Sequence, residues 1–348
     1  MRNTSMGTVV WSCLAVLLLA GCAAPLDLTG VQRESEQPLR RFDQFKAAAA
    51  QDERVVVVGD YGTVIVSPDG GNTLMRQQLP TRASLLDVTV CPDGRFAAID
   101  ARRNAWVSED GGENWQERPT GTQESPMAIA CDPQGRLWVT ASYSTLLLSE
   151  DLGASWDEIS QDEDMQLSAI QFLDASTAFV VGEFGTLLAS RDAGENWERI
   201  EGLPEDFYPL TVYFESPEHG WVAGLNGTVL HTQDGGATWE RQETPTAAPL
   251  YRLTRHAGVT FVAGDNGTLL RFDGDRWSPV PGTPQVLSYL IATVANGRGG
   301  LLVAGGQGTL GVMPMPTGHD RGVARDGVTV AATQVADTGW IDGRRKQP

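Results

Sequence analysis

A turn of the form Ser/Thr-x-Asp-x-Gly-x-x-Trp recurs along the chain. Four copies are complete and begin at Ser108, Ser149, Ser190 and Thr232. A first copy has Leu74 in place of the Trp, and a sixth is shortened. The aspartates are spaced by 41, 41, 41, 42 and 39 residues, and they are Asp69, Asp110, Asp151, Asp192, Asp234 and Asp273. A fixed period of this length indicates a repeat protein in which each unit packs against its neighbours.

A second motif, Gly-x-x-Gly-Thr, runs in step with the first. Complete copies start at residues 59, 182, 224, 264 and 305, and degenerate copies at Asp100 ("DARRN") and Ala141 ("ASYST") fill the gaps. Seven units therefore share one period. We interpret the motif as a tight reversal between two strands, because glycine readily takes the positive φ that such turns need. It does not read as a phosphate-binding loop, since no helix and no suitably placed Lys follow it.

Each unit reads as four short strands separated by turns. In the unit Ser84–Pro119, the runs "LLDVTV", "RFAAID", "AWVSE" and "WQERP" are separated by turn-forming residues. The sequence therefore predicts an all-β fold, a single seven-bladed β-propeller of four-stranded blades over residues 42–334. Blade one is expected to begin near Phe42 and blade seven near Val286.

The seventh unit lacks the acidic turn, so the origin of its outer strand is open. Residues 327–334 alternate apolar and polar side chains and are the preferred candidate. The alternative is that residues 26–34 close the ring. We expect residues 335–348 to be a C-terminal tail.

The repeated carboxylates are interpreted as structural. An Asp can accept backbone hydrogen bonds within its own turn, and a Trp can pack as a large apolar plate at the start of the outer strand. The Trp positions are Trp115, Trp156, Trp197 and Trp239. A catalytic role predicts one unusual copy rather than several similar ones, and Ca²⁺ needs more oxygen ligands than one turn offers.

The N-terminus reads as a lipoprotein signal peptide over residues 1–21. Arg2 precedes an apolar run that ends in "LAGC", which resembles the bacterial lipobox. The resemblance implies that Cys22 is lipidated and that residues 22–41 form a linker. We therefore expect a protein anchored in the cell envelope and facing the periplasm. Ala23 after the Cys favours the outer membrane in a Gram-negative host.

The formal net charge of −18 argues against a nucleic-acid partner, which would require clustered Lys and Arg. Apart from Cys13 and Cys22, the chain has only Cys91 and Cys131. The envelope permits a disulfide between them, and two buried thiols are the alternative.

The sequence contains no recognised set of active-site residues. The Asp turn resembles the Asp-box of bacterial neuraminidases, but no Arg-Ile-Pro motif is present, and no Tyr stands in a matching context. The four His are not spaced as metal ligands, and no Gly-x-Ser-x-Gly elbow occurs. We expect no enzyme activity, cofactor, metal or small-molecule substrate; the alternative is a sialidase-like glycan-active or glycan-binding propeller.

The pairing of both motifs in one unit resembles the photosystem II stability and assembly factor family, as in "VVGEFGTLLASRDAGENWERI". The resemblance covers roughly Phe42 to Met313. It implies a non-enzymatic propeller that binds a newly made membrane protein, a photosystem II reaction-centre subunit if the host is photosynthetic. An orphan scaffold of an envelope complex is a further alternative. Arg102 and Arg103, the only adjacent Arg pair inside the repeats, are the predicted partner-binding residues.

Overall fold

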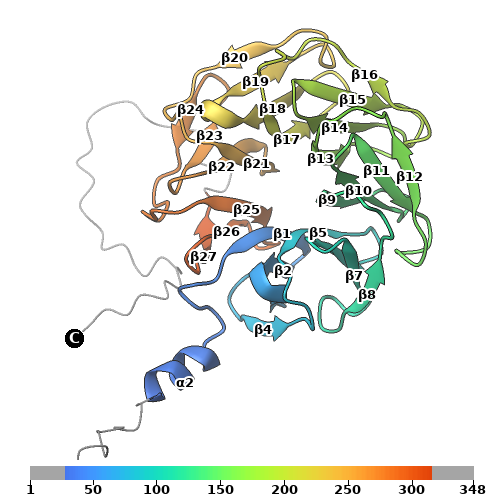
Figure 1. Cartoon of the computed structure of the whole chain (residues 1–348). Coiled ribbons are helices and arrows are strands. Elements are labelled where there is room, and N and C mark those ends of the chain that lie inside the picture. Colours follow the sequence, from blue (N-terminus) through green and yellow to red (C-terminus); the bar gives the residue numbers. More distant parts are fainter. Residues whose placement is uncertain (1–27, 316–348) are drawn as a thin grey trace, which may run out of the picture. The chain divides into compact units, whose positions relative to one another are not determined.

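The computed structural model describes residues 28–315, and its strands form seven separate antiparallel sheets. In Figure 1 the sheets stand around a ring, with the first strand of each sheet innermost and the last outermost. This arrangement confirms the predicted seven-bladed β-propeller.

The strands follow one another blade by blade. Blade 1 has β1 (Phe45–Gln51), β2 (Arg54–Gly59), β3 (Thr63–Ser67) and β4 (Met75–Gln78); blade 2 has β5 (Leu85–Val90), β6 (Phe96–Asp100), β7 (Asn104–Ser108) and β8 (Gln116–Pro119); blade 3 has β9 (Pro126–Cys131), β10 (Leu137–Ala141), β11 (Thr145–Ser149) and β12 (Asp157–Ser160). Blade 4 has β13 (Leu167–Phe172), β14 (Ala178–Gly182), β15 (Thr186–Ser190) and β16 (Glu198–Arg199); blade 5 has β17 (Pro209–Phe214), β18 (Gly220–Gly224), β19 (Val229–Thr232) and β20 (Glu240–Gln242). Blade 6 has β21 (Leu250–His256), β22 (Val259–Gly264), β23 (Leu269–Phe272) and β24 (Trp277–Pro279), and blade 7 has β25 (Leu290–Ala295), β26 (Gly300–Gly305) and β27 (Leu310–Pro314). Two 3-10 turns, η1 (Asp60–Gly62) and η2 (Leu225–Gly227), join the second and third strands of blades 1 and 5.

Blade 7 has three strands within the described residues. The preferred candidate for its fourth strand, residues 327–334, and the predicted tail lie outside them, as do the signal peptide and Cys22. The alternative closing segment, residues 26–34, is wrong as a strand in its described part, because Thr29–Glu36 forms the helix α2. This helix belongs to a separate unit that ends at Gln37, and the propeller unit begins at Pro38.

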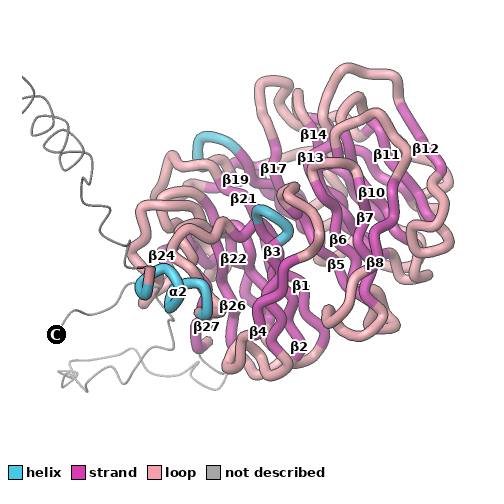
Figure 2. Tube along the Cα trace, turned by 60° about the horizontal axis from the view of Figure 1, so that its bottom comes forward, coloured by secondary structure: helices cyan, strands magenta, loops and turns pink. Residues whose placement is uncertain are grey.

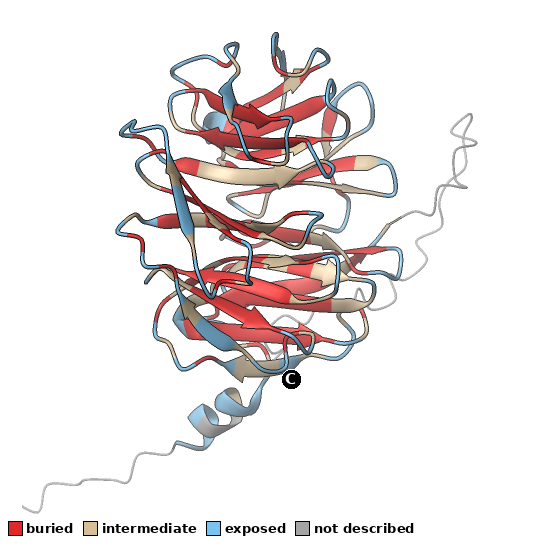
Figure 3. Ribbon diagram, turned by 90° about the vertical axis from the view of Figure 1, so that its right-hand side faces the viewer, coloured by how far each residue is buried: buried red, intermediate tan, exposed pale blue. Residues whose placement is uncertain are grey.

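Burial explains why these residues form blades. The second strands are buried along their whole length in blades 2 to 5, because neighbouring blades cover both faces of each sheet. The outer strands β8 and β12 are mostly exposed and carry charged residues. Figure 3 shows the same gradient, with buried strands inside and exposed loops at their ends.

Apolar clusters between neighbouring blades hold the ring together. One cluster joins Val56 and Val64 of blade 1 to Phe96 and Trp106 of blade 2. Each large apolar side chain buried in this way contributes about 1.5–3 kcal/mol relative to exposure.

The ring closes between blades 7 and 1 through side chains. Phe45 of β1 and Leu302 of β26 share a buried cluster with Leu39, which lies just before the first blade. The buried Asn296 donates from Nδ2 to the Gly70 carbonyl at 2.9 Å, and the Arg298 and Glu53 side chains form an ion pair at 2.8 Å.

Each recurring Asp fastens its own turn between the third and fourth strands. Around Asp151, the Ser149 hydroxyl and the Ser155 amide donate to Oδ1 at 2.9 and 2.8 Å, and the Ser155 hydroxyl donates to Oδ2 at 2.7 Å. The same pattern of three bonds recurs at Asp69, Asp110, Asp192 and Asp234. Asp273, in the shortened copy, accepts from the amides of Asp275 and Arg276.

The Trp residues close three of these turns with a further bond. The indole N–H groups of Trp115, Trp156 and Trp239 donate to the glycine carbonyl three residues earlier. Trp197 differs, because its buried indole nitrogen has no hydrogen-bond partner among the described residues. Its ring packs edge-on against Trp138 of the preceding blade at 5.9 Å between centroids.

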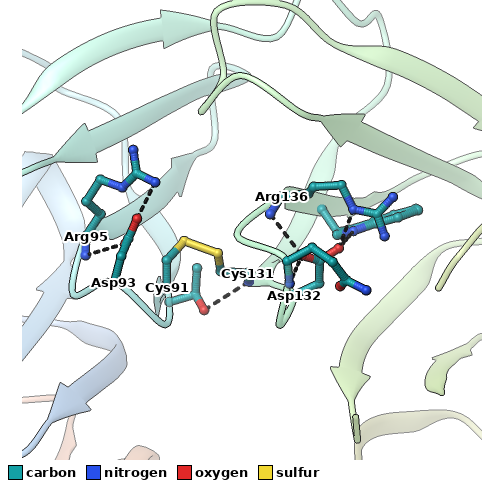
Figure 4. The surroundings of a disulfide bond; sticks show 9 residues. Cys91, Asp93, Arg95, Cys131, Asp132 and Arg136 are labelled. Atoms are coloured by element: carbon teal, nitrogen blue, oxygen red, sulfur yellow. Dashed lines mark hydrogen bonds and ion pairs between the residues drawn. A yellow bond between two sulfur atoms is a disulfide. The ribbon is translucent and has the colours of Figure 1, made fainter. Parts of the chain in front are cut away.

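A disulfide joins Cys91 and Cys131, so the structure has the bonded alternative rather than two thiols. The two Cα atoms are 5.1 Å apart, and the bond links the ends of the first strands of blades 2 and 3 (Figure 4). The Cys131 amide also donates to the Thr89 hydroxyl at 3.2 Å, so a disulfide and a hydrogen bond link the same two strand ends.

Candidate functional site

The propeller has two faces with different side-chain chemistry. We call one the box face: it carries the turns of the recurring aspartates and the turns between first and second strands. We call the other the turn face: it carries the turns between second and third strands and the segments that lead into each first strand. Figure 2 shows these loops at the two ends of the strands.

The recurring aspartates of the box face accept hydrogen bonds from their own turns. The hydrogen bond from the Ser155 side chain, with others from the turn, lowers the pKa of Asp151 to about 2. Partial burial raises the pKa of Asp110, but bonds from Asn114 and Ser108 outweigh it and lower the value to about 2. The pKa values of Asp69, Asp192, Asp234 and Asp273 are lowered as well, mainly by hydrogen bonds in the same turns. Such groups stay ionised near neutral pH and are poor general acids.

The turns of the turn face hold their third residue in the left-handed region in six of seven blades. These residues are Tyr61, Tyr143, Phe184, Asn226, Asn266 and Gln307, with φ between 53° and 58°. A type I′ hairpin requires this conformation and favours Asn-Gly, as blades 5 and 6 have. An aromatic residue there is unusual, because left-handed backbone costs a non-glycine residue roughly 1–3 kcal/mol.

Exposed apolar side chains of the propeller gather on the turn face. Their exposed fractions are 61% for Phe42, 71% for Tyr61, 46% for Tyr143, 46% for Phe184, 37% for Leu225 and 92% for Leu287. Within residues 38–315, the only other large apolar side chain of this kind is Met75, on β4. Exposed apolar groups gathered on one side of a soluble domain are typical of an interaction surface.

Arg102 and Arg103 also lie on the turn face, in the turn of blade 2. Arg102 is exposed and occupies the third position, where the neighbouring blades have Tyr61 and Tyr143. Arg103 is half-buried, has φ 70°, and donates from Nη1 to the Gln123 carbonyl at 2.6 Å. Of the predicted pair, Arg102 is therefore the one that faces solvent.

The charges of the turn face are divided between its two sides. The loops of blades 1 and 2 carry the exposed Arg82 and Arg102. The loops that lead into blades 4 and 5, residues 160–166 and 200–208, carry six acidic residues and no Lys or Arg; these are Asp162, Glu163, Asp164, Glu201, Glu205 and Asp206.

The innermost strands carry an ion pair that crosses the axis of the ring. Arg252 is the third residue of β21 and Asp87 the third residue of β5, and their side chains meet at 2.8 Å. They belong to blades 6 and 2, which are not neighbours. The buried Asp87 also accepts from the Ile129 amide at 3.1 Å, and so satisfies a backbone group at the open edge of β9.

A second polar group lies at the inner rim of the turn face. Lys46 of β1 lies 3.6 Å from Asp60 and donates to the Tyr289 hydroxyl at 3.3 Å, which joins blades 1 and 7. Burial raises the pKa of Tyr289. The charged side chains of this cluster pair with one another, as those of Asp87 and Arg252 do.

A pocket of about 350 Å³ lies between blade 5 and the loop of residues 200–208 that leads into it. Its lining includes the buried Phe207, the half-buried Trp239, and Tyr208, Leu225 and Arg241. The centroid of the Tyr208 ring lies 5.5 Å from that of Phe184, so the pocket lies next to an exposed aromatic residue of the turn face.

Residues 28–315 hold neither a metal site nor a membrane-spanning helix. No group of three or more His, Cys, Asp or Glu side chains in this range is arranged to hold a metal ion. In that part of the chain, no helix has the length and apolar character needed to cross a membrane.

A match to a family model shows which family the chain belongs to. The family model described as photosynthesis system II assembly factor YCF48 matches residues 120–206 and 191–295, which together span half of the chain. The chain belongs to the YCF48 family. No curated protein matches the sequence.

Solved structures of the YCF48 family share the fold. One, YCF48 bound to D1 peptide, has 21% identity and a TM-score of 0.55, covering 66% of this chain and 77% of its own. YCF48 from Cyanidioschyzon merolae has 21% identity and a TM-score of 0.56, covering 66% and 80%. A virginiamycin B lyase from Staphylococcus aureus has 13% identity and a TM-score of 0.67, covering 81% and 97%. At these identities the likeness shows the propeller alone.

Sequence reasoning missed most of the turn face. The Asp87–Arg252 pair joins residues 165 positions apart, and no local pattern signals it. The exposed aromatic residues did leave a signal, because they stand at the third position of a motif whose other copies have Arg, Asn or Gln there.

Proposed function

We propose that this chain is a non-enzymatic propeller that binds another membrane or envelope protein and assists its assembly or stability. The family match carries this proposal, and the exposed apolar and aromatic side chains of the turn face support it. Aromatic residues and Arg are enriched where proteins bind each other.

In a host that makes photosystem II, we propose a reaction-centre subunit as the partner. The solved YCF48 bound to D1 peptide supports this choice, since it records a family member holding a peptide. In other hosts, a different membrane protein takes that place.

We further propose that the protein is a lipoprotein held in the envelope by acyl chains on Cys22 and facing the periplasm, in the outer membrane of a Gram-negative host. The support is the "LAGC" pattern after an apolar run. Mass spectrometry of the mature N-terminus tests it: a chain that starts at Cys22 and carries acyl groups is expected, and an unmodified Cys22 contradicts it.

Charge reversal on the turn face tests the proposed function. The variant Arg102→Glu/Arg103→Glu should capture the partner from detergent-solubilised host membranes at least several-fold less well than the wild type. Arg191→Glu, an exposed Arg on the box face, is the matched control and should capture normally. Thermal unfolding of all three proteins reports whether the fold is intact.

A partner bound equally by wild type and double variant contradicts the role of the Arg pair. Failure of the wild type to enrich any membrane protein over the partner-free resin contradicts the proposed function as a whole.

A further inference from the structure

The third positions of the turns in the four adjacent blades 1 to 4 carry residues that proteins favour at interfaces. They are Tyr61, Arg102, Tyr143 and Phe184, and we call them the arc. Blades 5 to 7 have Asn226, Asn266 and Gln307 at the same position. The difference lies in four adjacent blades, although all seven turns have the same length.

Backbone conformation argues against a structural reason for the arc. Tyr61, Tyr143 and Phe184 have left-handed backbone, which Asn adopts more readily than an aromatic residue. Their side chains are also exposed, so burial does not offset the strain. Strained residues that gather on one surface point to binding.

The arc reaches the pocket beside blade 5. Phe184 contacts Tyr208, which lines the pocket together with Phe207, Leu225 and Trp239. Its volume of about 350 Å³ is at the small end of the range for small-molecule sites, which is roughly 300–1,000 Å³. An aromatic or branched apolar side chain buried in such a pocket is the usual anchor of a protein interface.

Hydrogen bonds place the charged loops beside the arc. The Gly62 amide donates to the Ala83 carbonyl, next to Arg82, at 2.9 Å. The Gly185 amide donates to the Phe207 carbonyl, next to Asp206, at 2.8 Å. The arc therefore has arginines at its blade 1–2 end and carboxylates at its blade 4–5 end.

We infer that the arc and the pocket together bind an extended segment of a partner protein. The segment inserts an apolar or aromatic side chain into the pocket. Its acidic groups contact Arg82 and Arg102, and its basic groups contact Glu205 and Asp206. This inference rests on the proposed function and specifies the segment that is recognised. Complementary charge at both ends fixes the orientation of the segment on the face.

A membrane surface is the competing occupant of exposed aromatic residues. Anionic lipid attracts basic patches, whereas the loops at residues 160–166 and 200–208 carry six acidic residues, of which only Glu163 and Glu201 pair with Arg199 of β16. The charge division therefore favours a peptide segment with both signs of charge over a lipid surface.

The test uses synthetic peptides and the purified protein. The first peptide has a central Leu-Phe pair, glutamates on one side and lysines on the other. One control peptide has the same composition with alternating charges, and another has Ser-Ser at the centre. By fluorescence anisotropy, the first peptide should bind at least about tenfold more tightly than either control.

The protein variant Tyr143→Asn/Phe184→Asn separates binding from folding. Asn is the residue of blades 5 and 6 at this position, so the thermal midpoint should stay equal or rise, while affinity for the first peptide falls about tenfold. Met75→Asn, which removes the exposed apolar side chain elsewhere in the propeller, is the matched control and should bind normally.

Equal binding of all three peptides, or unchanged binding by the Asn variant, overturns the inference. So does flotation of the wild type, but not of the Asn variant, with vesicles containing phosphatidylglycerol. If the wild type captures its membrane partner and the Asn variant captures it equally well, the arc is excluded while the proposed function stands.

Discussion

At the scale of single residues, the cross-axis pair of Asp87 and Arg252 is the least expected feature. Two innermost strands of non-neighbouring blades meet through one ion pair of 2.8 Å. Asp87 is buried, and Arg252 is partly exposed. A buried carboxylate is costly to leave without a partner, so the two members of the pair are not equally replaceable.

Arg252→Ala should destabilise the propeller by about 2 kcal/mol, less than a fully buried pair would, because water can reach the vacated site. Arg255→Ala is the comparison, since Arg255 pairs with the partly exposed Glu215, and its loss should cost less than about 1 kcal/mol. Urea unfolding measures both. An Arg252 variant as stable as the Arg255 variant would show that the cross-axis pair has no special weight.

At the scale of elements, the Asp turn recurs both as a sequence motif and as a hydrogen-bonded turn between the third and fourth strands. Five copies share the same bonds to a Ser or Thr two residues before the Asp and to a residue four after it. In the five boxes that have it, the glycine two residues after the Asp lets the turn approach the preceding blade. At Gly112, a Cβ would lie 2.8 Å from Val56 of blade 1, and at Gly194 it would overlap the indole of Trp138.

These turns make the stability of the fold depend on acid. The pKa of Asp151 is about 2 in the folded chain, below its ordinary value of 3.8. A carboxylate with a lowered folded pKa stabilises the fold above the unfolded value and loses that contribution as pH falls through the folded value. The thermal midpoint should therefore be steady above pH 4 and fall steeply between about pH 4 and pH 2.

The variant Asp151→Asn isolates one turn. It should be less stable than the wild type at pH 7 and should lose less stability between pH 4 and pH 2, because one titrating group is gone. Thermal unfolding followed by circular dichroism at a series of pH values measures both. Parallel profiles for the two proteins would mean that the Asp151 turn does not contribute to the acid sensitivity.

At the scale of the whole molecule, contacts between neighbouring blades hold the ring together. In the described residues, blades 7 and 1 meet without exchanging a strand, through the cluster around Phe45 and Leu302 and the Asn296 bond. In Figure 1 this junction lies where β25 and β1 come together. Every other junction joins blades that are consecutive in the chain.

The disulfide reinforces one junction of the ring. Cys91 and Cys131 close a loop of 40 residues, and a cross-link of this length stabilises by about 3–4 kcal/mol through the unfolded chain. The reductant dithiothreitol should lower the thermal midpoint of the wild type to that of Cys91→Ser/Cys131→Ser. The double variant should not respond to the reductant. A wild type insensitive to reduction under unfolding conditions would contradict this stabilisation.

The repeat is enough to predict much of the fold. The period of 41 residues, the alternation within each unit and the paired motifs give the number of blades, the order of strands and the place of each turn, because these depend on local chain geometry. How the ring closes is harder to predict from the sequence. Residues 26–34 are one candidate for the closing strand, whereas Thr29–Glu36 is helical. The choice between strand and helix there depends on few residues with weak periodicity.

The sequence by itself determined that this protein is a ring of similar blades whose aspartates and glycines shape its turns, because each of those bonds lies within a few residues. Only the tertiary structure decided which side chains share a face. The arc and the pocket beside Tyr208 arise when successive blades are set side by side, and the Asp87–Arg252 pair arises when blades far apart in the chain are brought round one axis. The physical reason is that a turn fixes its own backbone, whereas a binding surface depends on what the closed ring leaves exposed.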